Sequence, residues 1–511
     1  MQLINITVMT KRLSYIILLC VLPLMGWGQG FDDMVARMNV KSLPLINLEV
    51  EIDSVSHLYF IPGRLTLVEY NNGSAKPQIY NCLVRQRGKT ALFLPKWSFA
   101  VKLVDDNGEK LDANLLGLRE DNSWILDAMG IDKLRMRNRV CFDIWNEYSH
   151  TMWDTKFGNR NGTVGTMVEV FVNSEYAGIY CLSDKINRQL LNLRKAKVED
   201  DDSVTIKGVL YKGKGSGLSN TLLDYEEDRT DTIKWNTFEL QYPEEYPSLE
   251  TWKPLMDLIE FNGKTELDYF KANYNEWYYI DNLADYFLLL VALGIDDMPY
   301  KNTFLSLPDI NFDHRFMLTP WDLDACLGRG CNGTPLYYTS QLTRLNNFGP
   351  FNRIIYYNID DFKDRVARRW DELKDSVFSP DNLENHITAI AQRYVESGAW
   401  QREYDLWKDV GEDVEEGEDY DERIIIVENV YEEVDFVMEW YRNNHAYITR
   451  QLLRWHNDYE EPDVITSATI TQIYNYILGN NPEYDERLDL NGDGTINSAD
   501  VTFGYNVILG S

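Results

Sequence analysis

The spacing of oxygen-bearing side chains near the C-terminus constrains the fold of this chain most strongly. They stand at positions 1, 3, 5, 7, 9 and 12 of one short segment: Asp489, Asn491, Asp493, Thr495, Asn497 and Asp500. Position 6 is Gly494, which permits the sharp turn that a calcium-binding loop needs, and Asp500 closes the shell with a carboxylate. The segment is therefore predicted to bind Ca²⁺ through these six residues, and a short amphipathic helix is expected after it.

A degenerate copy of this segment precedes it. Residues 465–479 match residues 496–510 at a constant offset of 31 residues, as in an internal duplication. The first copy has lost its loop, since Pro462, Asp463 and Thr469 stand at the positions of Asp493, Gly494 and Asp500. The duplication and the Asp at position 12 of the loop resemble dockerins. That resemblance implies a small all-α module over residues 458–511 and a cohesin-like partner.

The N-terminus reads as a secretory signal peptide. Lys11 and Arg12 precede an apolar run from Leu13 to Met25, and small residues follow up to Gly28. We expect residues 1–28 to be removed and the protein to be exported, to an extracellular, periplasmic or cell-surface location. No later run is long and apolar enough to span a membrane.

Charge and cysteine content limit the partners. The net charge of −31, from 81 acidic and 50 basic residues, excludes a nucleic-acid surface of the usual basic kind. Five cysteines follow the signal, without a CxxC pair, so a zinc site is not expected. Cys326 and Cys331 either close a small disulfide loop or remain partly buried free thiols.

Two acidic clusters lie between Gly294 and Gly328. Asp297 is followed five residues later by Asn302, and Asp322 and Asp324 come about twenty residues after that. Protein kinases order their essential groups in this way: an Asp for the substrate hydroxyl, an Asn, and then a metal-binding Asp after a hairpin. The order and spacing together favour phosphoryl transfer.

The region between the signal and the tail, residues 29–457, has strand patterns early and helix patterns later. Alternating stretches predict strands over residues 46–52, 63–70, 78–85, 98–103 and 316–323, and a hairpin over residues 168–182. Residues 132–148 and 277–293 have the apolar period of helices. Asn72-Gly73 marks a turn between two strands. This pattern predicts an α+β fold of two lobes.

The same region resembles the CotH kinases, secreted or spore-coat proteins with an atypical protein-kinase fold. The resemblance covers most of residues 40–457. Its carriers are Arg87-Gly88 with Pro95-Lys96, the stretch from Asp121 to Asn138, Asn173 with Gly178, Asp297 with Asn302, and Pro320-Trp-Asp-Leu-Asp324 with Gly328. The acidic stretch at the end is the most specific of them.

The resemblance implies a role for each candidate residue. Asp297 would orient or deprotonate the substrate hydroxyl, and Asn302 would help to bind a metal on ATP. Asp322 and Asp324 lie two apart, so on a strand they would share one face and could hold Mg²⁺ or Mn²⁺. Lys96 is the first choice for neutralising the nucleotide phosphates. Lys102, Arg87 and Lys301 are weaker choices.

These observations lead to one main hypothesis and two alternatives. The main one is an exported atypical protein kinase that transfers the γ-phosphoryl of ATP to Ser or Thr of extracytoplasmic proteins. The first alternative is a non-catalytic pseudokinase or scaffold in a cell-surface assembly, one that handles polysaccharides for example. The second is a glycoside hydrolase, which needs two carboxylates about a sugar cleft; no spacing here singles out such a pair.

Overall fold

The fold of the chain is mixed α+β. The computed structural model describes residues 30–153, 160–214, 221–223, 237–298, 301–337, 348–410, 425–459 and 465–509. The predicted signal peptide lies outside these residues. Two compact units divide the chain: the first comprises Met1–Arg139, Thr163–Lys185 and Ile387–Val434, and the second comprises Val140–Gly162, Ile186–His386 and Asp435–Ser511.

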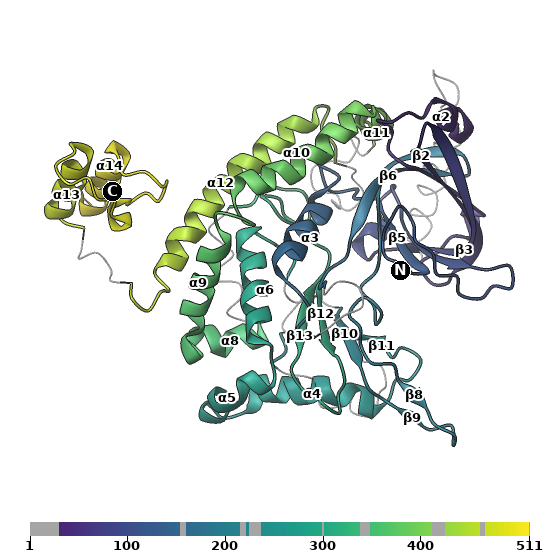
Figure 1. The fold of residues 1–511 in the computed structure, drawn as a ribbon, viewed down its shortest axis with the longest axis horizontal. Coiled ribbons are helices and arrows are strands. Elements are labelled where there is room, and N and C mark those ends of the chain that lie inside the picture. The colour runs from purple at the N-terminus through teal and green to yellow at the C-terminus, as the bar shows by residue number, and fades with distance from the viewer. Residues whose placement is uncertain are drawn as a thin grey trace, which may run out of the picture. The chain divides into compact units, whose positions relative to one another are not determined.

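The first unit is built on a closed barrel of seven strands, drawn in purple and blue in Figure 1. The strands are β1 (Leu45–Val50), β2 (Ile61–Asn71), β3 (Ser74–Arg87), β4 (Ser98–Val104), β5 (Ser123–Asp127), β6 (Gly165–Val172) and β7 (Glu175–Ser183). Their order around the barrel is β1-β2-β3-β4-β5-β7-β6, and β1 closes it by pairing in parallel with β6. All the predicted early strands are confirmed.

Local sequence explains how the barrel is formed. Asn72 and Gly73 have φ of 51° and 81°, and these left-handed residues make the tight β2–β3 hairpin that the sequence predicts. Alternate residues of β4, among them Phe99, Val101 and Leu103, join the buried barrel core. The helices α2 (Phe31–Arg37) and α11 (Ala399–Trp407) belong to this unit, and α11 packs on β7.

The second unit contains a four-stranded sheet of order β11-β10-β12-β13. Its strands are β10 (Val209–Gly213), β11 (Phe238–Tyr242), β12 (Thr303–Leu307) and β13 (Met317–Pro320), and β8 (Lys197–Val198) pairs separately with β9 (Val204–Thr205). Its helices include α4 (Leu249–Lys264), α5 (Leu267–Asn273), α6 (Ile280–Ala292), α8 (Gly349–Tyr356) and α9 (Phe362–Leu373). Helix α6 contacts β13 and runs beside α9 (Figure 1).

Three further helices contribute residues to both units. They are α3 (Arg137–Tyr148), α10 (Pro380–Glu396) and α12 (Val430–Leu453). The helix predicted over residues 132–148 begins five residues late, because the carboxylate of Asp132 accepts hydrogen bonds from the backbone N–H groups of Leu134, Met136 and Arg137 and holds a turn there. None of the helices in the described ranges is long and apolar enough to cross a bilayer.

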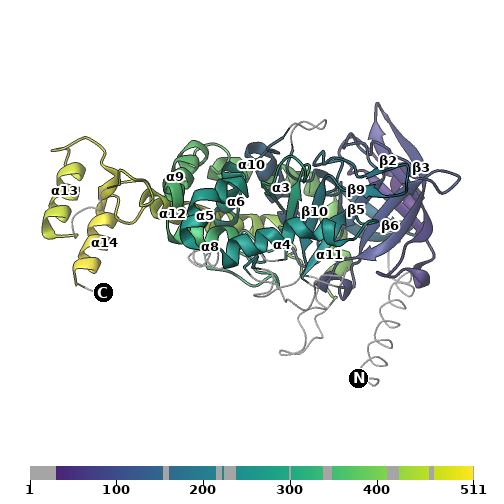
Figure 2. The same ribbon diagram turned by 90° about the horizontal axis from the view of Figure 1, so that it is seen from below.

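The C-terminal segment has a small core of its own. Helices α13 (Ser467–Ile477) and α14 (Ser498–Leu509) pack against each other, as Figure 2 shows in yellow. Ile470 and Ile473 of α13 are buried with Leu488, Ile496 and Val501. Thr466 begins α13 with a capping box, because its side chain and that of Thr469 each bond the backbone of the other residue. The two helices predicted from the duplication are therefore present.

Candidate active site

The two acidic segments meet at one end of the β12–β13 hairpin. Thr303 pairs with Pro320 at that end, and the next residues outward are joined by a hydrogen bond from the N–H of Trp321 to the carbonyl of Asn302, at 2.9 Å. The N–H of Asp296 donates to the carbonyl of Ala325 at 2.8 Å. The first bond places Asn302 beside the start of the second acidic segment, which carries Asp322 and Asp324. The second bond connects the first acidic segment, which carries Asp297, to the end of the second.

The carboxylate of Asp297 is held by two neighbours. Lys301 Nζ lies 2.7 Å from Asp297 Oδ2, and Asn302 Nδ2 donates to the same oxygen at 3.2 Å. Burial acts to lower the pKa of Lys301, but its hydrogen bond to Asp297 and the charges of Asp297 and Asp322 outweigh this and raise it. Lys301 therefore stays a cation, and its contact with Oδ2 fixes the direction of the Asp297 carboxylate.

Asp322 and Asp324 do not lie on a strand. Strand β13 ends at Pro320, and Asp322 has a φ of 58°, in the left-handed region that Asp tolerates better than most residues. Asp322 and Asp324 therefore do not share one face of a strand, and that prediction is wrong. They leave instead from an irregular segment, where Asp322 is exposed and Asp324 is half-buried.

The charges of the acidic groups nevertheless shift the pKa values of the same two neighbours, Cys331 and Lys301. Burial raises the pKa of the Cys331 thiol, and the charges of Asp297, Asp296 and Asp324 raise it further, whereas Lys301 lowers it. Since both acidic segments influence Cys331, and Asp297 and Asp322 both influence Lys301, the carboxylates lie around one small region. Asp296 is a member of this group that sequence reasoning missed.

Helix α12 supports the acidic segments. Gly294 and Gly328, at either end of the region, have φ of 61° and 84°, and a Cβ on either would come within 2.7 Å of the Trp440 ring. The amide of Asn444 donates to the carbonyls of Val291 and Ala292 at the end of α6, at 3.1 and 2.7 Å. Both glycines are needed for this close packing, which fixes the chain before and after the carboxylates.

The donor set fits a hard divalent cation. Asp322 and Asp324 offer carboxylate oxygens and Asn302 an amide oxygen, which are the ligand types that Mg²⁺ prefers in proteins. The amide nitrogen of Asn302 donates to the carbonyl and to Oδ2 of Asp297, both at 3.2 Å, and these bonds orient its side chain. Asn302 is also almost fully buried, with 4% of its surface exposed, so its orientation is set by the fold.

In the first unit, Lys96 is buried in a cluster of charges. Its Nζ lies 2.6 Å from Glu403 Oε1 and donates to the carbonyl of Ile179 at 2.7 Å. Arg135 Nε also donates to Glu403 Oε1, at 2.7 Å, and the Ile179 N–H donates to Glu403 Oε2 at 2.7 Å. Burial lowers the pKa of Lys96 to about 7; Glu403 opposes this shift and the nearby Arg135 adds to it. Sequence reasoning found Lys96 and included Arg135 in a family motif without giving it a role, but it missed Glu403.

The weaker phosphate candidates lie elsewhere on the barrel. Lys102 is on β4, as predicted, but it points away from the core on an exposed position, with Nζ 4.6 Å from the centre of the Phe60 ring. Arg87 ends β3 opposite Ser98 and is half-buried. The polar turn after it contains Gly88 with φ of 125°. Of the three, Lys96 is ion-paired with Glu403 at 2.6 Å.

Comparison with known proteins identifies the family. A model of the CotH kinase protein family matches residues 84–448, well over half of the chain. The chain belongs to the CotH kinase protein family. No curated protein matches it. The matched range includes the acidic segments, Lys96, Lys102, Arg87 and Glu403, and it ends before the C-terminal calcium-loop pattern.

The predicted calcium loop of this CotH kinase protein is curled around its first carboxylate. Asp489 Oδ1 accepts from the N–H of Gly492 at 2.7 Å, and Oδ2 accepts from the N–H of Gly494 at 2.8 Å. Asp500 reaches back, with Oδ1 accepting from the N–H of Asn491 at 3.0 Å. Burial raises the pKa of Asp489, and the charges of Asp500 and Asp493 raise it further. Carboxylates that repel one another in this way suit a cation.

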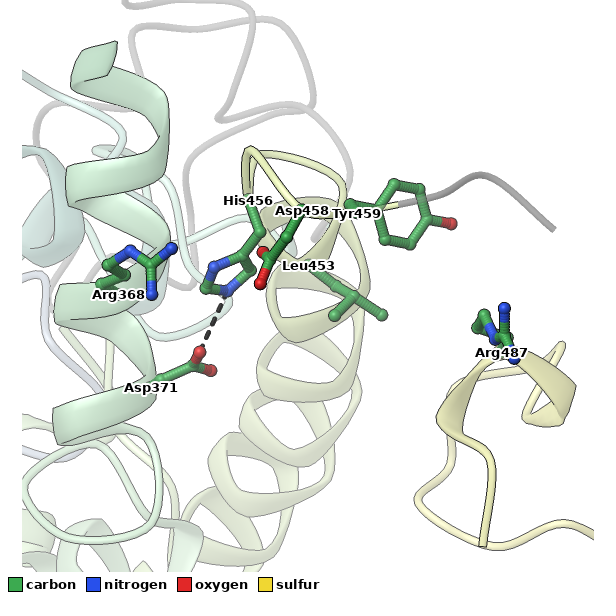
Figure 3. Close-up of a pocket in the computed structure, with 7 residues that line it drawn as sticks. All are labelled: Arg368, Asp371, Leu453, His456, Asp458, Tyr459 and Arg487. Atoms are coloured by element: carbon green, nitrogen blue, oxygen red, sulfur yellow. Dashed lines mark ion pairs between the residues drawn. The ribbon is translucent and has the colours of Figure 1, made fainter. Parts of the chain in front are cut away.

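A separate polar pocket lies where α9 faces the end of α12 (Figure 3). Its lining residues are Arg368, Asp371, Leu453, His456, Asp458, Tyr459 and Arg487. The Nε2 of His456 lies 3.0 Å from Asp371 Oδ2, as the dashed line shows. Asp364, His456 and Asp458 bring ligand atoms within 4.8 Å of one another. However, Arg368 Nε donates to Asp364 at 2.7 Å, so this cluster already has a cation and gives no reason for a metal ion.

Proposed function

We propose that this CotH kinase protein is an exported atypical protein kinase that transfers the γ-phosphoryl group of ATP to a Ser or Thr hydroxyl of an extracytoplasmic protein. The pair of backbone hydrogen bonds from Asp296 to Ala325 and from Trp321 to Asn302 carries the proposal. They gather two acidic segments and an amide at one end of a hairpin. Phosphoryl transfer requires such a set, because catalysis is mostly positioning and charge neutralisation.

Asp297 is suited to the substrate hydroxyl in this proposal. Its carboxylate orients the hydroxyl and accepts the proton as the new O–P bond forms and the bond from the γ-phosphorus to the bridging oxygen breaks, which releases ADP. Lys301 and Asn302, which contact Oδ2, fix the direction of the carboxylate. Lys301 therefore positions Asp297, which is a different role from the phosphate contact expected from the sequence.

Asn302, Asp322 and Asp324 are the residues that would hold Mg²⁺ or Mn²⁺. Such an ion, when bound, offsets the negative charge of the phosphate oxygens. The buried Asn302 and the packing of Gly294 and Gly328 on Trp440 keep these ligands in place before any nucleotide arrives. Preorganisation of this kind lowers the cost of charge development during transfer.

Lys96 and Glu403 supply the second feature that the proposal needs. Protein kinases hold the lysine that contacts the nucleotide phosphates in an ion pair with a glutamate, and both partners must be in place for activity. The pair at 2.6 Å supports the same role for Lys96. Arg87 and Lys102 remain the other proposed contacts to the nucleotide.

The test is transfer of labelled γ-phosphate from ATP, with Mg²⁺ or Mn²⁺, by the mature chain. Asp322→Asn should lower the rate at least about 100-fold, because one metal ligand is lost. Asp313→Asn is the matched control: Asp313 lies on the same hairpin, before β13, where it pairs with Arg315. The control should keep the wild-type rate. Wild-type transfer by both Asp322→Asn and Asp324→Asn would overturn this assignment of the metal ligands.

A second candidate function is a non-catalytic scaffold, and the burial of Lys96 favours it. The Lys96 side chain has no exposed surface and already has two acceptors, Glu403 and the carbonyl of Ile179. A scaffold should show no change in melting temperature with Mg-ATP, whereas the kinase should be stabilised by binding. A shift that Asp322→Asn abolishes would speak for the kinase.

The tail extends the proposal. We infer that Asp489, Asn491, Asp493, Thr495, Asn497 and Asp500 bind one Ca²⁺ and that the folded segment docks to a cohesin-like partner. The curled loop and the repulsion among Asp489, Asp493 and Asp500 support the calcium site. Calcium titration of the mature chain, followed by calorimetry, tests it; an Asp493→Ala variant should lose the heat of binding.

A further inference from the structure

Two cysteines far apart in the sequence are in contact beneath the acidic segment. Cys141 is in α3 and Cys326 comes two residues after Asp324, and their Sγ atoms lie 3.3 Å apart. Both residues are fully buried, with 0% of their surface exposed. A thiol pair enclosed at this distance can do little except hydrogen-bond or become a disulfide.

The surrounding structure holds the two sulfurs together. The Phe142 ring meets the Trp321 ring edge-on at 6.4 Å between centroids, so α3 packs on the acidic segment just before Cys326 as well as at it. The amide of Asn161 donates to the carbonyl of Leu318 at 3.0 Å, and Trp145 of α3 donates to the carbonyl of Asn161. Helix α3 is thus linked to β13 through Asn161 and contacts Cys326 through Cys141.

Formation of a disulfide bond between Cys141 and Cys326 requires only a small movement of the two sulfur atoms. A disulfide bond is about 2.0 Å long, so the sulfurs need to approach by about 1.3 Å, which side-chain rotation and slight adjustment of the backbone can supply. The alternative partner, Cys331, is exposed, whereas Cys326 is enclosed with Cys141. The structure therefore directs Cys326 to Cys141 and not to the loop closure with Cys331 that the sequence allowed.

We propose that Cys141 and Cys326 form a disulfide bond when the protein folds in an oxidising compartment, and that this bond fastens the segment carrying Asp322 and Asp324 to α3. The proposal uses the export assumed in the proposed function, because disulfides persist only where thiols are not kept reduced. It does not depend on the kinase activity itself.

The chemistry is thiol–disulfide exchange with a disulfide of the oxidoreductase or glutathione class. One protein thiol, as thiolate, attacks the incoming disulfide and releases one reduced sulfur. The second protein thiol attacks the mixed disulfide and releases the other. The two protein thiols lose two electrons and two protons, and the incoming disulfide leaves as two thiols. Because both sulfurs are enclosed in the folded unit, the exchange takes place before α3 and the acidic segment pack together.

Mass spectrometry of the full chain tests the proposal. The protein is recovered after export, denatured and alkylated without reductant. Compared with a reduced and alkylated sample, two cysteines should carry no alkyl group. After correction for the alkyl groups, the mass should be lower by two hydrogens. A non-reduced digest should contain the peptides of Cys141 and Cys326 joined together. Cys331→Ser should keep this joined peptide, and Cys141→Ser should lose it.

Refolding in a glutathione redox buffer distinguishes two reasons for a missing cross-link: the chain was not exported to an oxidising compartment, or Cys141 and Cys326 do not pair. If the exported chain or the refolded chain contains the joined peptide, the pairing is correct, whatever the protein's cellular location. Full alkylation of both cysteines in the refolded chain, or a peptide that joins Cys326 to Cys331, would overturn the proposal. A reductant should also lower the melting temperature of the wild type but not that of Cys141→Ser.

Discussion

The Nζ of Lys96 lies 2.6 Å from Oε1 of Glu403, and neither side chain is exposed to solvent. Glu403 has a second cation, Arg135, on the same oxygen at 2.7 Å. Two cations and one carboxylate share a site from which water is excluded, so the charges do not balance if both bases are protonated. Lys96 is the member that can release a proton, because a guanidinium stays charged.

This arrangement predicts unequal effects of removing the two partners. Glu403→Gln removes the carboxylate that contacts both Lys96 and Arg135 and should lower the free energy of unfolding by about 3–5 kcal/mol. Lys96→Met leaves the Arg135–Glu403 pair intact and should cost less than about 2 kcal/mol. Urea denaturation followed by fluorescence measures both. Equal losses would contradict this prediction, because Glu403 would then contribute no more to the stability of the cluster than Lys96 does.

The lowered pKa of Lys96 predicts a rise in stability with pH. Burial lowers this pKa from 10.5 to about 7 in the folded protein. Between those pH values the unfolded chain binds a proton that the folded chain lacks, so the free energy of unfolding rises as the pH rises, by up to about 5 kcal/mol. Below pH 7 this group adds no further change. Lys96→Met should flatten this part of the curve; an unchanged slope in the variant would assign it to other groups.

Gly178 tests the packing around Glu403. Its φ is 108°, and a Cβ there would lie 2.1 Å from Glu403 Oε2 and 3.0 Å from the indole nitrogen of Trp407. Gly178→Ala should therefore destabilise the protein by more than about 2 kcal/mol. Gly73 is the matched control, because its φ is 81° and nothing lies within 4 Å of its Cβ position. Gly73→Ala should cost about 1 kcal/mol from backbone strain alone. Thermal denaturation compares the two variants.

How much of this arrangement the sequence predicts depends on how local the signals are. The barrel strands and the Asn72-Gly73 hairpin were predictable, because alternation and turn residues act over a few positions. Glu403 was not, since 307 residues separate it from Lys96 and it stands in a helix with an ordinary amphipathic pattern. The pairing of Glu403 with Lys96 depends on the packing of α11 on β7, which is a tertiary contact.

In the acidic site, too, some features were predictable from the local sequence and others depend on tertiary packing. The order of Asp297, Asn302, Asp322 and Asp324 could be read along the chain, and a strand leading to Asp322 was predicted, whereas its partner β12 was not. Their positions could not, because the left-handed backbone of Asp322 and the bond from Asp296 to Ala325 depend on the packing beneath them. Placing Asp322 on a strand was wrong for this reason.

Calcium should order the C-terminal segment. The loop residues Asp489 and Asp500 close around one point, and their repulsion opposes folding unless a cation offsets it. Removing calcium with a chelator should reduce the protection of α13 and α14 from hydrogen exchange, and added calcium should restore it. Asp500→Asn should abolish this response. Asp485→Asn, which lies outside the loop and caps the turn before it, is the control and should retain it.

The carboxylate of Asp322 is best tested by a variant that keeps the backbone. Because φ is 58°, Ala at this position adds strain, whereas Asn accepts the left-handed conformation. Asp322→Asn should therefore keep the wild-type melting temperature and lose phosphoryl transfer at least about 100-fold. Asp322→Ala should lose the same activity and in addition about 1 kcal/mol of stability. Radiolabel transfer and thermal denaturation, measured on the same preparations, separate the two effects. If Asp322→Asn retained transfer while Asp322→Ala lost it, the residue would act through its backbone conformation and the carboxylate would have no part in the reaction.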